Sequence, residues 1–181
     1  MEDSICLWRG IYTLCPIANA VPTAEGAIQL AMEQLPVTLW GADCLILGCG
    51  RIAKLLAQRL HGLGANVCIA ARKYGDRAWA EASGWQALSM QQLSGSLQDT
   101  QVVFNTVPAL ILDSGLVAEL SSDCLYIELA SRPGIDLESA GNRQLNCICA
   151  GGLPGKVAPV TAAAAIRSTL YHILEERGEP V

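Results

Sequence analysis

The segment from Asp43 to Ala53 constrains the fold of this chain more than any other part of the sequence. A short apolar run, Cys44 to Leu47, is followed by a Gly-x-Gly-x-x-Ala pattern that begins at Gly48. The run has the length of a buried strand, and the pattern is typical of a tight turn that opens a helix. The first glycine permits the turn, the second lets backbone approach phosphates, and the small third residue lets helix pack close on strand. We therefore predict a binding site for a nucleotide pyrophosphate at a helix N-terminus.

The residues after the turn complete a β-α-β unit. Apolar side chains recur at helical spacing, at Ile52, Leu55, Leu56, Leu60 and Leu63. Gly62 to Gly64 predict the end of that helix, and Asn66 to Ala70 form a second apolar strand. A structural glycine turn that binds no nucleotide is the alternative interpretation.

The residues that follow the second strand indicate which nucleotide binds. About twenty residues after the turn, NAD-binding chains usually place an acid that hydrogen-bonds the ribose 2′-OH. Here Ala71 is followed by two cations, Arg72 and Lys73, which would attract a 2′-phosphate. We therefore predict NADP as the cofactor, with a solvated pair of cations at a strand end as the alternative.

Strands and helices alternate along the rest of the chain. We expect a helix over residues 22–34, a short helix over 77–83, a third strand over 85–88, a polar helical piece over 89–97, a fourth strand over 101–106, a helix within 110–120, a fifth strand over 124–130, a sixth over 144–150, and a long helix over 161–176. This alternation predicts an α/β fold, a doubly wound, Rossmann-like parallel sheet with helices on both faces. We assign residues 1–21 to an N-terminal extension and residues 22–181 to the domain itself.

Residues just after the strands are expected to form the site, because ligands of such sheets lie outside the carboxyl ends of the strands. The expected cofactor-binding residues are Gly48, Cys49, Gly50, Arg51, Ile52, Ala71, Arg72, Lys73, Asn105, Thr106, Val107, Pro108, Ala130 and Ser131. Asn105, Thr106 and Pro108 would flank the ribose on the nicotinamide side. Ordinary turn residues are the alternative interpretation of these loops.

A few further side chains are candidates for chemistry. Lys156, in the loop after the last strand, is the expected catalytic residue, where a cation would hold a substrate carboxylate or polarise a carbonyl. Its alternative is a solvated loop lysine. Glu128 is expected to pair with a cation or to line the cleft, since an unpaired carboxylate on an apolar strand is costly. Cys49 lies where a thiol can gain acidity, but a passive role is favoured.

Composition excludes several classes of protein. The chain has 181 residues, a net charge of −5 and no basic stripe, which argues against nucleic acid as a partner. No apolar stretch is long enough for a membrane span, and no signal peptide is recognisable. The eight cysteines are scattered, without a Cys-x-x-Cys pair, so we expect no metal site and reduced thiols in a cytoplasmic protein.

Six segments, taken in order, resemble the dipicolinate synthase A-subunit family. They are residues 20–26, 47–51, 70–73, 105–109, 130–134 and 153–162, and the resemblance extends over residues 19–175. Several of them are also similar to shikimate dehydrogenase and methylene-tetrahydrofolate dehydrogenase.

The resemblance implies an activity and partners. It implies an oxidoreductase of sporulation that oxidises a dihydrodipicolinate-type intermediate to pyridine-2,6-dicarboxylate, with NADP as hydride acceptor. It also implies a small dicarboxylate substrate, a homo-oligomer and, as partner, a flavoprotein-like B subunit. The loops of Ser131 and Lys156 would border the ring and the dicarboxylate. The alternatives are a shikimate-type or folate-type dehydrogenase domain, a non-catalytic NADP-binding regulatory module, and a degenerate domain retained only for assembly.

Members of that family carry a further N-terminal domain, whereas only residues 1–21 precede the first expected helix here. We therefore expect either an excised cofactor domain or a naturally short relative. In both cases the chain alone would lack one wall of the cleft that shields hydride transfer from water.

Overall fold

The structure is a computed structural model that describes residues 19–176. This described part divides into two compact units: residues 27–151 form the first, and residues 19–26 together with residues 152–176 belong to the second. Most of the expected N-terminal extension lies outside the described residues, so the boundary between residues 21 and 22 stays a prediction.

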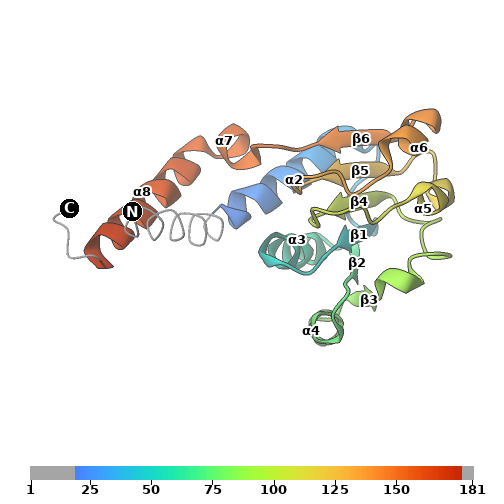
Figure 1. The fold of residues 1–181 in the computed structure, drawn as a ribbon, viewed down its shortest axis with the longest axis horizontal. Helices are drawn as coiled ribbons and strands as arrows, with labels where there is room; N and C mark the ends of the chain where they lie inside the picture. Colours follow the sequence, from blue (N-terminus) through green and yellow to red (C-terminus); the bar gives the residue numbers. More distant parts are fainter. Residues whose placement is uncertain (1–18, 177–181) are drawn as a thin grey trace. The chain divides into compact units, whose positions relative to one another are not determined.

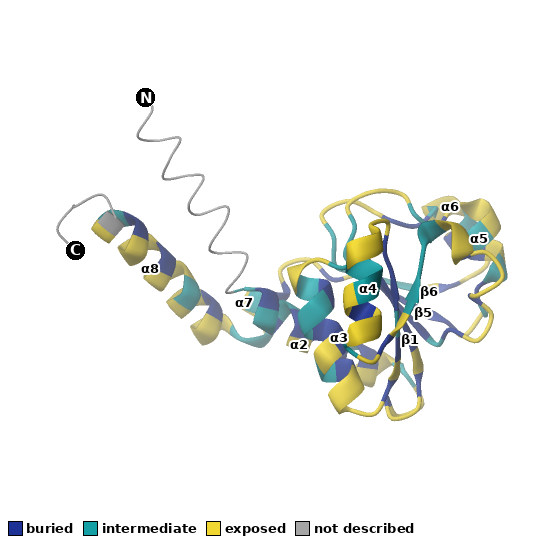
Figure 2. Cartoon of the chain, turned by 90° about the horizontal axis from the view of Figure 1, so that it is seen from below, coloured by how far each residue is buried: buried dark blue, intermediate teal, exposed yellow. Residues whose placement is uncertain are grey.

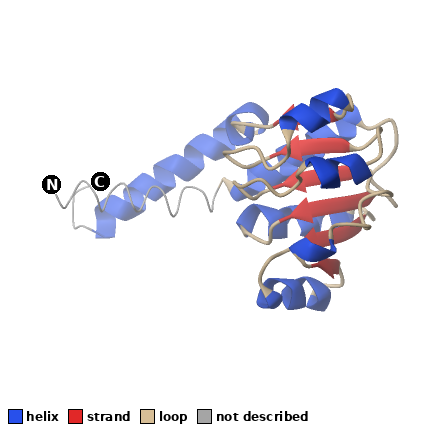
Figure 3. Cartoon of the chain, turned by 45° about the vertical axis from the view of Figure 1, so that its right-hand side comes forward, coloured by secondary structure: helices blue, strands red, loops and turns tan. Residues whose placement is uncertain are grey.

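The first unit is built on a six-stranded sheet. Its strands are β1 (Asp43–Leu47), β2 (Asn66–Ala70), β3 (Gln86–Leu88), β4 (Val102–Asn105), β5 (Leu125–Glu128) and β6 (Asn146–Cys149). All five pairs are parallel, in the order β3-β2-β1-β4-β5-β6, which Figure 1 shows as a stack and Figure 3 as arrows. The first strand, β1, thus lies at the centre of the sheet, with β2 and β3 on one side of it and β4, β5 and β6 on the other. This order confirms the predicted doubly wound sheet.

Helices cover both faces of this sheet. They are α3 (Arg51–Gly62), α4 (Tyr74–Ala82), α5 (Ser114–Glu119) and α6 (Leu137–Asn142). In Figure 2, α3 and α4 lie on one side of the strands and α5 and α6 on the other. Since both faces are covered, the central strands are almost fully buried, and Ile46 and Phe104 are 0% exposed. This burial explains the apolar runs from which the strands were predicted.

Helix α3 packs through a single apolar stripe. Its buried residues are Ala53, Leu56, Ala57 and Leu60, which recur at the spacing of one helix face. The helix ends at Gly62, as predicted, and the N–H of Ala65 then donates to the carbonyl of Leu60 at 3.0 Å.

Some local predictions were wrong. Residues 89–97 do not form a helical piece: only a 3₁₀ turn, η1 (Met90–Gln92), is present, capped by mutual hydrogen bonds of Ser89 and Gln92. Helix α4 begins at Tyr74 rather than at Arg77. Helix α6 was not predicted, and the Asp136 carboxylate caps it by accepting from the N–H of Ser139 at 2.8 Å.

The second unit is helical in its described part. Helix α7 (Leu153–Val157) occupies a segment that was expected to be a loop, and α8 (Pro159–Glu176) begins two residues before its predicted start. Helix α2 (Ala20–Gln34) also begins two residues early and runs from this unit into the first. Within residues 19–176, no helix is long and apolar enough to cross a membrane.

Candidate functional site

The predicted site residues of β1 and β4 meet at the carboxyl edge of the sheet. These two central strands are neighbours, and the chain leaves them in opposite directions, so a crevice is expected between their ends. Thr106 bridges them, because its N–H and its hydroxyl both donate to the carbonyl of Leu47, at 3.0 and 2.8 Å. The glycine turn and the loop of Thr106 to Pro108 therefore lie side by side, as the sequence predicted.

Gly48 has no room for a side chain. Its φ is +98°, in the region that favours glycine. A Cβ at this position would lie 2.6 Å from Oγ1 of Thr106 and 2.8 Å from Cγ2 of Val107. The first glycine of the pattern is therefore required by the contact between the two strand ends.

Gly50 is different, because a side chain there would enter open space. Its backbone is extended, it immediately precedes α3, and no atom lies within 4 Å of the position that a Cβ would take. Arg51 and Ile52 begin the helix, and Ala53 is fully buried against the sheet. Because Gly50 has no side chain to cap the helix, its N-terminus is open to an anionic group such as a pyrophosphate.

We expect Gly50→Ala to weaken dinucleotide binding while leaving the fold intact. The added methyl group meets no protein atom, so the free energy of unfolding should change by less than about 1 kcal/mol. A pyrophosphate would meet that methyl group, so NADPH affinity should fall at least about tenfold. Denaturant unfolding and calorimetric titration of the same sample measure both effects. Unchanged NADPH affinity would show that the pyrophosphate does not bind at this turn.

Cys49 is not an activated thiol. Its Sγ lies 3.7 Å from the carbonyl oxygen of Asp76. Burial raises the pKa of Cys49, and the Asp76 carboxylate adds to the rise, while the Lys54 ammonium opposes it. The gain in acidity considered from the sequence is therefore wrong, and the favoured passive role stays a prediction.

The end of β2 presents a basic edge. Ala71 is buried, whereas Arg72 and Lys73 are exposed just before α4. A third cation, Arg77, was not among the predicted site residues, and its Nη1 donates to the carbonyls of Ala71 and Arg72 at 3.0 and 2.9 Å. The available signal was a further basic residue only four positions after Lys73. Arg77 holds the turn that carries the two predicted cations.

Asn105 is fully buried, and its side chain is committed to hydrogen bonds within the protein. Its Nδ2 donates to the carbonyl of Val107 at 2.9 Å and to Oε1 of Glu128 at 2.8 Å, and its Oδ1 accepts from the N–H of Val107 at 3.0 Å. Any role of Asn105 in binding is therefore exerted through the shape of its loop.

Among the residues that the structure describes, Glu128 is held by neutral donors and not by a cation, which corrects the expected pairing with a cation, and a place beside the cleft stays a prediction. It is 6% exposed, and besides Asn105 it accepts hydrogen bonds from the hydroxyl of Tyr126 and the backbone N–H groups of Ala130 and Gly134. Four donors thus compensate for the burial of the carboxylate. Burial, followed by the hydrogen bond to Glu128, raises the pKa of Tyr126, so this phenol keeps its proton and donates it.

The remaining predicted residues have different surroundings. Pro108 and Ser131 are exposed and Ala130 is half-buried, in the loops after β4 and β5. Lys156 does not lie in a loop, because it is part of α7 in the second unit, where it is exposed. The role proposed for Lys156 stays a prediction.

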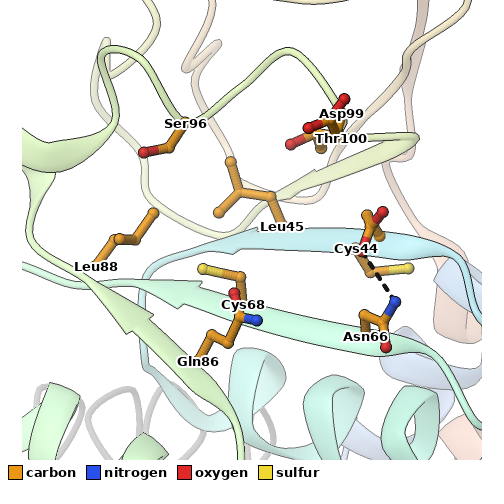
Figure 4. A pocket seen from close by; sticks show the side chains of 10 residues that line it. Cys44, Leu45, Asn66, Cys68, Gln86, Leu88, Ser96, Asp99 and Thr100 are labelled. Carbon is orange, nitrogen blue, oxygen red and sulfur yellow. Dashed lines mark hydrogen bonds between the residues drawn. The ribbon is translucent and has the colours of Figure 1, made fainter.

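A cavity of about 300 Å³ lies at the other edge of the sheet (Figure 4). It is lined by Asp43 and Asn66, the first residues of β1 and β2, and by Cys44 and Cys68. Burial and the nearby Asp43 carboxylate raise the pKa of Cys44 to about 12, and burial raises that of Cys68 to about 11. Protonated thiols are poor nucleophiles, so neither Cys44 nor Cys68 is an activated thiol. Within residues 19–176, no group of three or more His, Cys, Asp or Glu side chains could hold a metal ion.

A parallel sheet in this strand order, with a glycine turn at the switch between its central strands, defines a Rossmann-like α/β domain. The chain is 34% identical to the A subunit of dipicolinate synthase from Bacillus subtilis over 161 residues, which are 88% of this chain and 54% of that protein. The resemblance recognised in the sequence is thereby confirmed: over 88% of its length, this chain is similar to the A subunit of dipicolinate synthase.

Solved structures agree with this relationship. The crystal structure of the A subunit of dipicolinate synthase from Bacillus halodurans has a TM-score of 0.86 and 35% identity, over 88% of this chain and 56% of that one. The chain thus spans about half the length of the relatives it matches. L-alanine dehydrogenase, at 17% identity and a TM-score of 0.69 over 91% of this chain and 55% of that one, shares the fold. No family model matches the chain.

Proposed function

We propose that this chain binds NADP(H) at the carboxyl edge of its sheet and serves as the cofactor-binding part of a dipicolinate-forming oxidoreductase. The relationship to the A subunit of dipicolinate synthase supports the reaction. Because those relatives are named as one subunit of a synthase, the relationship also supports assembly with a second subunit, which we propose to be of the B type.

One observation carries the proposal for the cofactor. The open position above Gly50 and the exposed cations Arg72 and Lys73 follow β1 and β2, which are adjacent parallel strands. Their carboxyl ends therefore lie at the same edge, where a dinucleotide would span from pyrophosphate to adenosine ribose. The turn would hold the pyrophosphate, and the two cations would hold the 2′-phosphate.

The chemistry would be that of the cofactor, since bound NADP accepts a hydride at its nicotinamide ring. The protein would orient that ring through the loop of Thr106 to Pro108 and the loop of Ala130 and Ser131. Lys156 would hold a carboxylate of the dihydrodipicolinate-type substrate. Because the chain matches about half of its relatives, we propose that hydride transfer needs further protein to close the site.

Calorimetric titration of the purified chain with NADP and NAD tests this proposal. Two added phosphate contacts should favour NADP by at least about tenfold, or roughly 1.4 kcal/mol, at moderate salt. Equal or reversed affinities would remove Arg72 and Lys73 from their proposed role. A preference for NADP without oxidation of any dihydrodipicolinate-type substrate, even with the second subunit present, would favour a regulatory module instead.

A further inference from the structure

Glu128 connects the two loops that border the proposed nicotinamide side. Its Oε1 accepts from Nδ2 of Asn105 at 2.8 Å and from the N–H of Ala130 at 2.9 Å. Its Oε2 accepts from the hydroxyl of Tyr126 and from the N–H of Gly134, each at 2.7 Å. One carboxylate at the end of β5 therefore holds the end of β4 and both ends of the turn from Ala130 to Gly134.

The loop after β4 is bonded at two points to residues that Glu128 holds, Asn105 and Gly134. Asn105 both donates to and accepts from the backbone of Val107, which shapes the chain next to Thr106 and Pro108. Further along, the N–H groups of Ile111 and Leu112 both donate to the carbonyl of Gly134 at 2.9 Å. The shapes of the two loops therefore depend on each other.

Gly134 is packed so closely against this network that a larger residue would not fit. A Cβ there would lie 2.7 Å from Cγ of Asn105 and 3.1 Å from the Tyr126 hydroxyl. The network is also largely buried, since Asn105 and Tyr126 are at most 1% exposed and Glu128 is 6% exposed. Because buried polar groups are costly when a partner is lost, this network has one well-defined geometry.

We infer that Glu128 is a positioning residue for the nicotinamide half of the dinucleotide, which it serves by holding these two loops in a binding-competent shape. The inference rests on the proposed function. In the strand order, β5 is separated from β1 by β4, whereas the proposed pyrophosphate and 2′-phosphate contacts follow β1 and β2. Glu128 should therefore influence one half of the cofactor and not the other.

The variant Glu128→Gln tests this idea, because it replaces one acceptor oxygen by an amide donor at nearly constant shape. That amide would face either the N–H of Ala130 or the N–H of Gly134, and neither can accept. We expect NADPH affinity to fall about tenfold, while affinity for adenosine 2′,5′-bisphosphate stays within about twofold of wild type. Calorimetry on the full chain measures both affinities.

Glu119→Gln is the matched control. Glu119 also accepts from a hydroxyl and a backbone N–H, those of Ser94 and Gly95, but it lies on α5 and is only half-buried. It should leave both affinities unchanged. If Glu128→Gln does not fold, Tyr126→Phe removes a single donor to the same carboxylate and should still weaken NADPH selectively.

Each outcome has a distinct meaning. Equal losses for NADPH and the bisphosphate would show a merely structural role for Glu128, and unchanged affinities would show none, so either result overturns the inference alone. A wild-type chain that binds neither ligand would overturn the proposed function together with the inference.

Discussion

Replacing Gly48 by alanine should destabilise the chain by about 2–5 kcal/mol and abolish measurable dinucleotide binding. The positive φ of +98° costs a residue with a Cβ about 1–2 kcal/mol. Overpacking against Thr106 and Val107, at 2.6 and 2.8 Å, adds about 1–3 kcal/mol. Binding should also be lost, because relief of the contact requires the ends of β1 and β4 to move apart at the site. Denaturant unfolding, followed by titration of the folded fraction with NADPH, measures both effects.

Gly50→Ala is the comparison that makes this result specific. Both variants add one methyl group within the same turn, but only that at Gly48 meets protein atoms. Gly48→Ala should lower the melting temperature by roughly 5–15 °C, whereas Gly50→Ala should shift it by a few degrees at most. Equal stabilities of the two variants would show that the contact between Gly48 and Thr106 is not a real constraint.

Removal of the two cations after β2 is the second change with a large expected effect. We expect Arg72→Ala with Lys73→Ala to reduce NADP affinity by about 10–100-fold and to leave NAD affinity within about twofold of wild type. Both side chains are exposed, so their loss should cost little stability. Calorimetry at two salt concentrations measures the effect, and the wild-type preference for NADP should shrink as salt rises.

Arg167→Ala is a suitable control, because it removes an exposed cation from α8, away from the end of β2 in the sequence. It should change neither affinity. A double variant that loses NAD and NADP equally would show a general loss of the binding edge. Full retention of NADP affinity would contradict the assignment of the 2′-phosphate to Arg72 and Lys73.

The central strands were predictable because each is a short, mostly apolar run that is buried on both faces. The runs at Cys44–Leu47 and Val102–Asn105 show this directly, since a parallel sheet covered by helices needs no polar alternation. Short polar elements were less predictable. Helix α6 has six residues and one buried side chain, so no apolar stripe marks it. The helix predicted over residues 89–97 does not form, because hydrogen bonds between Ser89 and Gln92 stabilise a single 3₁₀ turn instead.

Some features of the candidate site were likewise predictable from the sequence, and others were not. The amino-acid sequence alone determined the glycine turn and the cations Arg72 and Lys73, because a turn, a strand end and their charges depend on residues adjacent in the chain. Only the tertiary structure decided the contacts among Asn105, Glu128 and Gly134, which lie 23 and six positions apart in the sequence and meet at one edge of the sheet. The tertiary structure also decided the difference between Gly48 and Gly50. A Cβ at Gly48 would contact Thr106, whereas a Cβ at Gly50 would contact no protein atom. Local patterns report backbone conformation, whereas contacts between distant segments depend on how the sheet aligns their ends.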